Sequence, residues 1–326
     1  MTALASMLSR RTLGLLALGT ALLPGSSWAA WPDKPIRLVV PYSAGGGADN
    51  TARIVAQRLG ELLGQAIIID NKPGAGGVIG ADSVAKANPD GYTVLYDASA
   101  FCVNAALRKL PYDPAKDFIP VSLVATAPQI LVVNPRAPYK TVADLVAAAK
   151  KAPGQLSYAS AGAGTASHLA AEMLNDQARI DTLHVPYKGG APALTDVMAG
   201  QVDLYFGNAA STLQYLSSGK LRALAVSSRT RVPGLDKVPT LSESGLPDYA
   251  VLEWNGVFLP KGTPKDIVDR LAKATREAIA DPGIRERLKQ AGLEPSGNSP
   301  EEFGAFVKSE SARWQAVVKA RHITLD

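Results

Sequence analysis

Short apolar runs rich in branched residues alternate with helical patterns along the first third of the chain. The runs at 36–40, 66–70 and 93–96 have the length and composition of buried parallel strands. Between them, 50–63 carries apolar residues at helical spacing, and 78–87 offers a second helix before a turn. The order strand, helix, strand, helix, strand predicts an α/β unit with a parallel sheet.

A second series of similar segments follows. Its strand candidates are 129–133, 156–159, 182–185, 204–206 and 223–227. Helices are expected between them at 142–149, 167–174 and 192–199. We expect this series to form its own sheet and its own core.

The end of the chain changes to long amphipathic helices. One face is kept apolar by Ile267, Leu271, Ala274 and Ala278. A capped helix start at Ser299 precedes a stripe formed by Phe303, Phe306, Val307 and Trp314. These helices need a surface to cover, and the first sheet is the candidate. The chain would then leave the first domain near residue 130 and return near 252, and two such crossovers form a hinge over a cleft.

The first 29 residues have the plan of an export signal. Arg10 and Arg11 precede an apolar run at 13–23 that is too short to span a membrane, and small Ser27 and Ala29 suit cleavage after Ala29. The pair of arginines leaves the Sec and twin-arginine routes both open. We therefore predict a signal peptide at 1–29, a first domain at 30–130 plus 253–326, a second domain at 131–252, and a periplasmic location.

Composition narrows the class of protein. Removing 29 of 326 residues leaves 297, and the net charge falls from +5 to +3 because only Arg10 and Arg11 are lost. A balance this close to neutral argues against nucleic acid as a partner. The single Cys102 excludes a disulfide framework and a multi-thiolate metal site. A monomer is the default expectation.

Glycine-rich turns carry the candidate chemistry. In LVVPYSAGGGADNTAR, a strand runs into Gly45, Gly46 and Gly47 and then into a helix, so backbone N–H groups can point at an anion where the helix dipole is positive. Comparable turns return in NKPGAGGVIG, YASAGAGTASH and YKGGAP. Several such turns in one chain suggest that they converge on one cleft that binds a carboxylate or phosphate.

The composite pattern resembles the substrate receptors of tripartite tricarboxylate transporters, the Bug family. The resemblance covers nearly all of 31–265 in order, through the segments WPDKPIRLVVPYSAGGGADNTAR, NKPGAGGVIGADSVAKANPDGYT, LPYDPAKDF, LSYASAGAGTASHLAAE, HVPYKGGAPALTDVMAGQVDLYF, GKLRALAVSS and VPTLSESG. One departure is Tyr42-Ser43-Ala44, where the family more commonly has a proline-rich stretch. The resemblance implies a two-domain periplasmic binding protein of the type II fold, without a cofactor, that presents a small carboxylate to integral membrane transporter subunits.

Candidate ligand-binding residues come from both expected domains. Tyr42, Ser43, Gly46 and Gly47 would form the first half of the carboxylate site. The facing half would be formed by Gly164, Thr165, Ser167, His168 and Tyr187. Asp49 would repel a bound carboxylate, so we expect it to cap the following helix instead.

The sequence does not determine which chemical group the ligand carries at the end away from its carboxylate. Asp97 ends a strand where an α/β cleft is expected, and would favour an ammonium, amide or pyridinium group if it points inward. Ser99 and Asn208 add uncharged donors. A dicarboxylate, an amino acid and a nicotinate-like acid all remain candidates.

Other classes of protein find little support. The chain has no dinucleotide fingerprint, no phosphate-binding GxxxxGK[ST] loop, no G-x-S-x-G elbow and no pair of histidines at metal-binding spacing. An α/β enzyme is therefore a remote alternative. A receptor that signals to a sensor kinase is a nearer one, because it would use the same exposed faces around the cleft.

Overall fold

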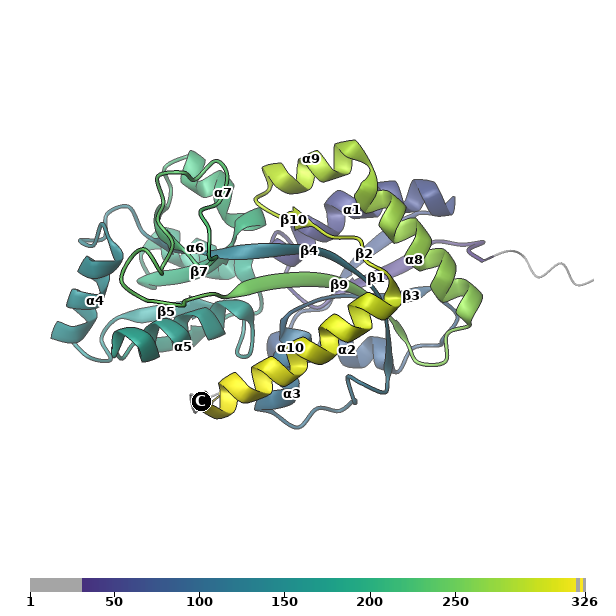
Figure 1. Cartoon of the computed structure of the whole chain (residues 1–326), viewed down its shortest axis with the longest axis horizontal. Coiled ribbons are helices and arrows are strands. Elements are labelled where there is room, and N and C mark those ends of the chain that lie inside the picture. Colours follow the sequence, from purple (N-terminus) through teal and green to yellow (C-terminus); the bar gives the residue numbers. More distant parts are fainter. Residues whose placement is uncertain (1–30, 321–322, 325–326) are drawn as a thin grey trace, which may run out of the picture.

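The computed structural model describes residues 31–320 and 323–324, and the predicted signal peptide lies outside them. Figure 1 shows two lobes joined by two long strands. The first lobe contains β1 (Ile36–Val40), α1 (Gly47–Leu63), β2 (Ile67–Asn71), η1 (Ala75–Gly77), α2 (Val78–Ala85), β3 (Thr93–Ala98), α3 (Ala100–Leu107), α8 (Lys265–Ala280), α9 (Pro282–Gln290), β10 (Glu294–Pro295) and α10 (Pro300–Ala320). The second lobe contains α4 (Val142–Lys151), β5 (Ser157–Ser160), α5 (Ala166–Ala178), β6 (Leu183–Pro186), α6 (Gly190–Ala199), β7 (Leu204–Asn208), α7 (Ala209–Ser217) and β8 (Arg222–Val226).

The two joining strands are β4 (Phe118–Val133) and β9 (Leu252–Pro260). The expected α/β fold with two crossovers is thus confirmed, and β1, β2 and β3 pair in parallel as predicted. The structure adds β9, α3, α7 and the first part of β4, which the periodicity did not predict as regular elements. The domain boundaries at 130 and 253 stay a prediction.

The expectation of two separate sheets is wrong, because β4 belongs to both halves of one sheet. The strand order is β2-β1-β3-β9-β4-β7-β5-β6, with β8 and β10 also paired to β4. From Phe118 to Pro128, β4 pairs with β9, and from Gln129 to Val133 it pairs with β7 and β8. Pro128 has no N–H to donate to a neighbouring strand. The strand β4 therefore changes its pairing partners at a residue that cannot form a full set of backbone hydrogen bonds. At this junction Ser227 accepts a hydrogen bond from the Gln129 N–H at 2.8 Å.

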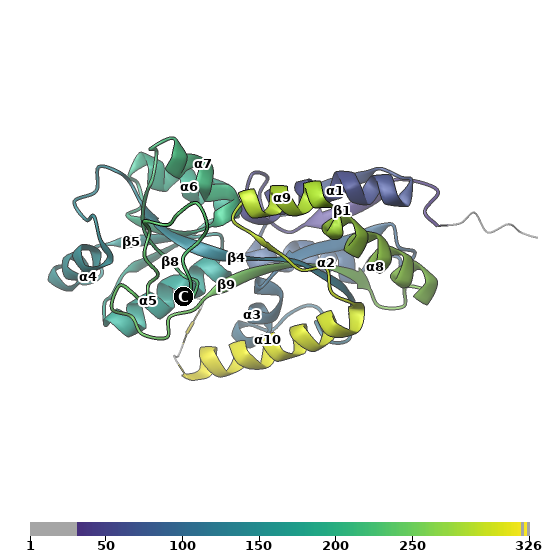
Figure 2. The ribbon, with the colours of Figure 1, turned by 45° about the horizontal axis from the view of Figure 1, so that its top comes forward.

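Alternation along the strands of the first lobe builds a core on each face of the sheet. Leu38 and Val40 pack with α1, α8 and α9 on one face, whereas Val39 and Leu95 point to the other. Figure 2 shows α1 and α9 above the sheet and α3 and α10 below it. The amphipathic helices of the C-terminal region therefore cover the first sheet, as predicted.

Local sequence explains where these helices begin. Ser299 and Glu302 exchange hydrogen bonds between side chain and backbone at the start of α10, which confirms the predicted cap. The face of α8 that is buried includes Ile267, Leu271 and Ala278. Among the described residues, no helix is long and apolar enough to cross a membrane.

Candidate functional site

A small cavity of about 30 Å³ lies between the lobes, at the level where β4 and β9 pass from one to the other. Its lining includes Tyr42 and Ser99 from the first lobe and Ser167 and Tyr205 from the second. A cavity this small leaves little free space between the lobes. The two lobes are therefore closed on each other in this structure.

Five helices begin at the wall of this cavity. The lining contains residues from the first turn or cap of α1, α3, α5, α6 and α7, namely Gly46, Gly47, Ala48, Ser99, Ala100, Thr165, Ala166, Ser167, Gly190 and Asn208. The first N–H groups of a helix have no acceptor within it, and each N-terminus carries roughly half a positive elementary charge. Five such ends give the cavity a positive potential that favours an anion.

The helix ends act without support from basic side chains. Among the described residues that line the cavity there is no lysine, arginine or histidine. The arrangement is therefore built from backbone amides and a few neutral polar groups. Ser99 is one of these, since it is 1% exposed and its Oγ has no hydrogen-bond partner in the described protein.

The first glycine loop uses two of its three amides internally. The Gly45 N–H donates to Asp49 Oδ2 at 2.9 Å, and the Gly46 N–H donates to the Ser43 carbonyl at 3.3 Å. Asp49 also accepts hydrogen bonds from Arg53 and Asn71. Burial raises the pKa of Asp49, but these hydrogen bonds outweigh it and the net pKa is lowered. Asp49 thus stabilises the loop before α1, and Gly47 remains to face the cavity.

The floor of the cavity is polar and comes from the joining strands. Gln129 lies on β4 and Glu253 on β9, and Gln129 Nε2 donates to Glu253 Oε2 at 2.8 Å. Asn208 Nδ2 donates to the same oxygen at 3.1 Å. Burial raises the pKa of Glu253, although these donors act against the shift. Three lining residues, Gln129, Tyr205 and Glu253, were not predicted, because nothing in their local sequence distinguishes them from ordinary strand residues.

The structure brings seven of the twelve predicted residues to the cavity wall, and these seven are Tyr42, Gly46, Gly47, Ser99, Thr165, Ser167 and Asn208. The other five lie nearby without lining it. Asp97 sits behind Tyr42, whose hydroxyl donates to Asp97 Oδ1 at 2.8 Å, and it also accepts from the Ala98 N–H at 2.7 Å. Burial raises the pKa of Asp97 to about 7.

His168 turns away from the cavity. Its ring stacks on His184 with centroids 4.4 Å apart, and Tyr158 stacks on His184 at 4.7 Å. Its Nδ1 accepts a hydrogen bond from the Gly164 N–H at 3.2 Å, which uses the amide that was expected to bind ligand. Burial lowers the pKa of His168 to about 3, so the ring is neutral at physiological pH. His168 supports the loop that precedes α5.

Ser43 and Tyr187 help to hold the lobes and loops together. The Ser43 N–H donates to the Lys188 carbonyl across the cleft at 3.2 Å. The Tyr187 hydroxyl donates to Asp196 at 2.5 Å, and Asp196 lies on α6. In addition, Arg108 at the end of α3 donates to the Ala163 carbonyl of the second lobe at 2.8 Å.

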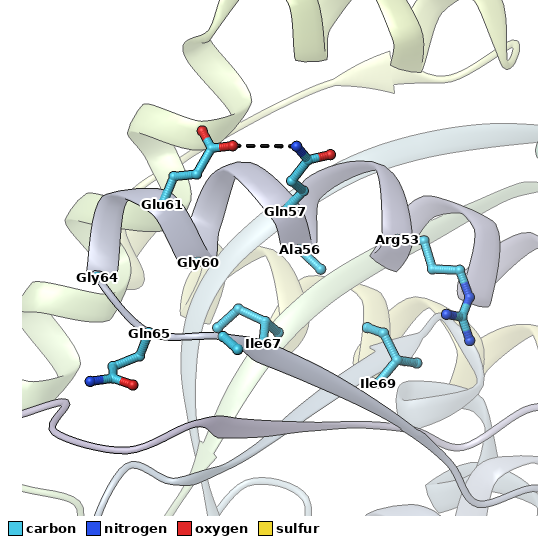
Figure 3. Close-up of a pocket in the computed structure, with 10 residues that line it drawn as sticks. Arg53, Ala56, Gln57, Gly60, Glu61, Gly64, Gln65, Ile67 and Ile69 are labelled. Carbon is cyan, nitrogen blue, oxygen red and sulfur yellow. Dashed lines mark hydrogen bonds between the residues drawn. The ribbon is translucent and has the colours of Figure 1, made fainter.

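A larger groove of about 710 Å³ lies on the surface between α1 and β2 (Figure 3). Its lining mixes Arg53, Glu61 and the apolar side chains of Ile67 and Ile69. Gln57 donates to Glu61 along the helix at 3.3 Å. The groove runs along the side of α1 and has no convergence of helix N-termini, so the small cavity is the better candidate for an anion site.

Metal chemistry finds no support in the described ranges, where no group of three or more His, Cys, Asp or Glu residues could hold a metal ion. Cys102 is buried, and burial raises the pKa of its thiol to about 12. A thiol in that environment is a poor nucleophile.

Comparisons with known proteins agree with this geometry. Residues 51–323 match the family described as tripartite tricarboxylate transporter family receptor. The structure of the periplasmic binding protein BugD is similar, with a TM-score of 0.88, 40% sequence identity, and coverage of 90% of this chain and 99% of that one.

Two further similar structures contain ligands. Rpa4515 of R. palustris with adipate has a TM-score of 0.87 and 37% identity over 90% of this chain and 99% of that chain. MatC of Rhodopseudomonas palustris with bound malate has a TM-score of 0.85 and 34% identity over 88% of this chain and 100% of that chain.

Proposed function

This chain belongs to the tripartite tricarboxylate transporter family of receptors, and on that premise we propose that it captures a small carboxylate-containing metabolite between its lobes and delivers it to a membrane transporter. Members of the family are periplasmic binding proteins, as the similar BugD structure illustrates. The class of protein is thus a solute-binding receptor, and the ligand and the transporter partner are the proposal.

The convergence of five helix N-termini on one cavity carries the proposal. A carboxylate placed there would accept hydrogen bonds from backbone amides of both lobes. Because Thr165 and Ser167 belong to one wall and Tyr42 and Gly47 to the other, a bound anion would join the lobes. A ligand that contacts both lobes binds the closed form better than the open form, and that difference in affinity drives closure.

Entry of a metabolite requires the lobes to separate. The cavity of about 30 Å³ is narrow in the closed form, so a metabolite reaches it once the lobes move apart. We infer that the lobes open by bending at β4 and β9, close to the predicted boundaries at residues 130 and 253. The direct contacts that opening would break include the hydrogen bonds from Ser43 to Lys188 and from Arg108 to Ala163.

Ligands of the similar proteins support a carboxylate for this chain. Adipate and malate, found in the two R. palustris proteins, are both dicarboxylates. For this chain we propose the wider class of a dicarboxylate, an amino acid or a nicotinate-like acid, since the floor of its cavity contains Glu253.

A thermal-shift panel tests the proposal. Purified mature protein is heated with each of a set of carboxylates and, as controls, with the uncharged alcohol or amide of the same carbon skeleton. We expect one or a few carboxylates at 100 times their Kd to raise the free energy of unfolding by about 2.7 kcal/mol, and the neutral controls to do nothing. NMR of the same samples should show the carboxylates unchanged. If no carboxylate stabilises the protein, the proposed function is wrong.

A further inference from the structure

Glu253 is the one carboxyl side chain among the described residues that line the cavity. It lies at the start of β9, on a joining strand. Its Oε2 accepts hydrogen bonds from both Gln129 Nε2 and Asn208 Nδ2, at 2.8 and 3.1 Å. Both of these donors meet at one oxygen, and the side chain of Asn255 also favours the charged form of Glu253.

The orientation of the Asn208 amide is fixed by its second role. Asn208 caps α7, and its Oδ1 accepts a hydrogen bond from the Ala210 N–H at 2.9 Å. The other end of the amide, Nδ2, must therefore face Glu253 as a donor. Two amide donors directed at one oxygen are the environment of a carboxylate that acts as an acceptor.

Glu253 has no counter-charge in the protein. None of the ion pairs within residues 31–320 includes it, and the cavity lining contains no basic side chain. Carboxylates withdrawn from bulk water are normally paired with a positive group. The helix N-termini supply partial positive charge to the cavity, but no cationic side chain among its described lining residues neutralises Glu253.

Resting on the proposed function, we propose that this receptor selects carboxylates that also carry a protonated amine. The ligand carboxylate lies against the first turns of α1 and α5, and its ammonium group donates to the Glu253 carboxylate. A zwitterion of this kind matches both charges of the cavity, the positive helix ends and the negative floor. A plain dicarboxylate would place its second carboxylate beside a like charge.

Matched pairs of ligands test this selection. Calorimetry of the purified mature protein at pH 7.5 compares aspartate with succinate, and 4-aminobutanoate with butanoate. Native protein should bind the aminated member of at least one pair about tenfold or more tightly, because only that member can donate a hydrogen bond from a charged group to Glu253.

Three variants separate the role of Glu253 from general damage. Glu253→Gln keeps an acceptor oxygen for Gln129 and Asn208 but removes the charge, so it should lose the preference or reverse it toward the plain acid. Glu253→Asp keeps the charge and should retain the preference, even with weaker binding. Glu61→Gln, on the exposed face of α1, is the control and should behave as the native protein does. The melting temperature of each unliganded variant verifies that it folds.

The outcomes distinguish this inference from the proposed function. Native protein that binds succinate or butanoate as well as the aminated partner overturns the selection for an amine but leaves carboxylate capture standing. An unchanged preference in folded Glu253→Gln, or a reversal produced by Asp97→Asn instead, also overturns the assignment to Glu253. Absence of binding to every acid in the panel contradicts the proposed function itself.

Discussion

Gly47 lies where the first turn of α1 meets α7, and adding one methyl group there should prevent closure. A Cβ built on Gly47 would lie 2.4 Å from Asn208 Cγ and 2.6 Å from Asn208 Cβ. Carbon atoms in contact are about 3.5–4.0 Å apart, so the two helices would have to separate by about 1 Å. Asn208 cannot simply rotate away, because its side chain is held by Ala210 and Glu253.

The steric clash of the added methyl group with Asn208 destabilises only the closed form. Overpacking of a well-packed contact costs about 1–3 kcal/mol, which corresponds to roughly 5- to 150-fold weaker ligand binding if only the closed form binds. Gly47 is the first residue of α1 and is not among the glycines with positive φ, so alanine fits the backbone of the open form. We therefore expect the unliganded Gly47→Ala protein to fold with nearly native stability.

Calorimetry and small-angle scattering measure the two effects. The ligand is the carboxylate that stabilises the native protein most in the thermal-shift panel. Gly47→Ala should bind it more weakly and should show less compaction on adding it. Gly304→Ala on α10 is the matched control, because its Cβ would meet only Pro120 Cγ at 3.9 Å. Native affinity in Gly47→Ala would refute the reasoning that the ligand is held with α1 and α7 in contact.

Two further predictions concern groups near the cavity. The pKa of Asp97 is about 7 in the folded protein and 3.8 as its ordinary value, so the unfolded chain loses this proton first and stability should fall as pH rises from about 4 to 7, by up to about 4 kcal/mol. Urea unfolding of Asp97→Asn should show a shallower fall over this range, and an identical pH dependence would contradict the assignment. Arg108→Met removes the hydrogen bond to the Ala163 carbonyl and should weaken binding by about fivefold, since about 1 kcal/mol of closed-form stabilisation is lost. Equal affinity in calorimetry would show that this contact does not favour the closed form.

The sequence predicted the parts of the fold that have clear periodicity. Strands β1, β2 and β3 and helices α1 and α8 were predictable because their apolar residues repeat at strand or helix spacing. Helix α3 was missed because the run AFCVNAAL is apolar on all sides, which gives no helical stripe. Strand β9 was missed because its WNGVFL segment follows a long irregular stretch.

Two properties of the site could not be predicted from the sequence. One is the direction in which a side chain points, and the other is contact between residues that lie far apart along the chain. Asp97 is the second-last residue of β3 and Ser99 caps α3, yet only Ser99 reaches the cavity wall, because the chain turns into a helix after Ala98 and Asp97 lies behind Tyr42. Ser167 and His168 differ in the same way on α5, where neighbours point about 100° apart. Glu253 was not foreseeable, because it meets Gln129 and Asn208 only through the pairing of distant strands.

The helix ends that surround the cavity are divided between the lobes. How strongly the bound anion is held therefore depends on whether the lobes are closed or open. Those of α1 and α3 move with one lobe, and those of α5, α6 and α7 move with the other. Separation of the lobes splits the attracting field into two weaker parts, since the effect of each dipole fades within about one turn. A membrane component that only pulls the lobes apart would thereby discharge the bound anion without having to compete for it.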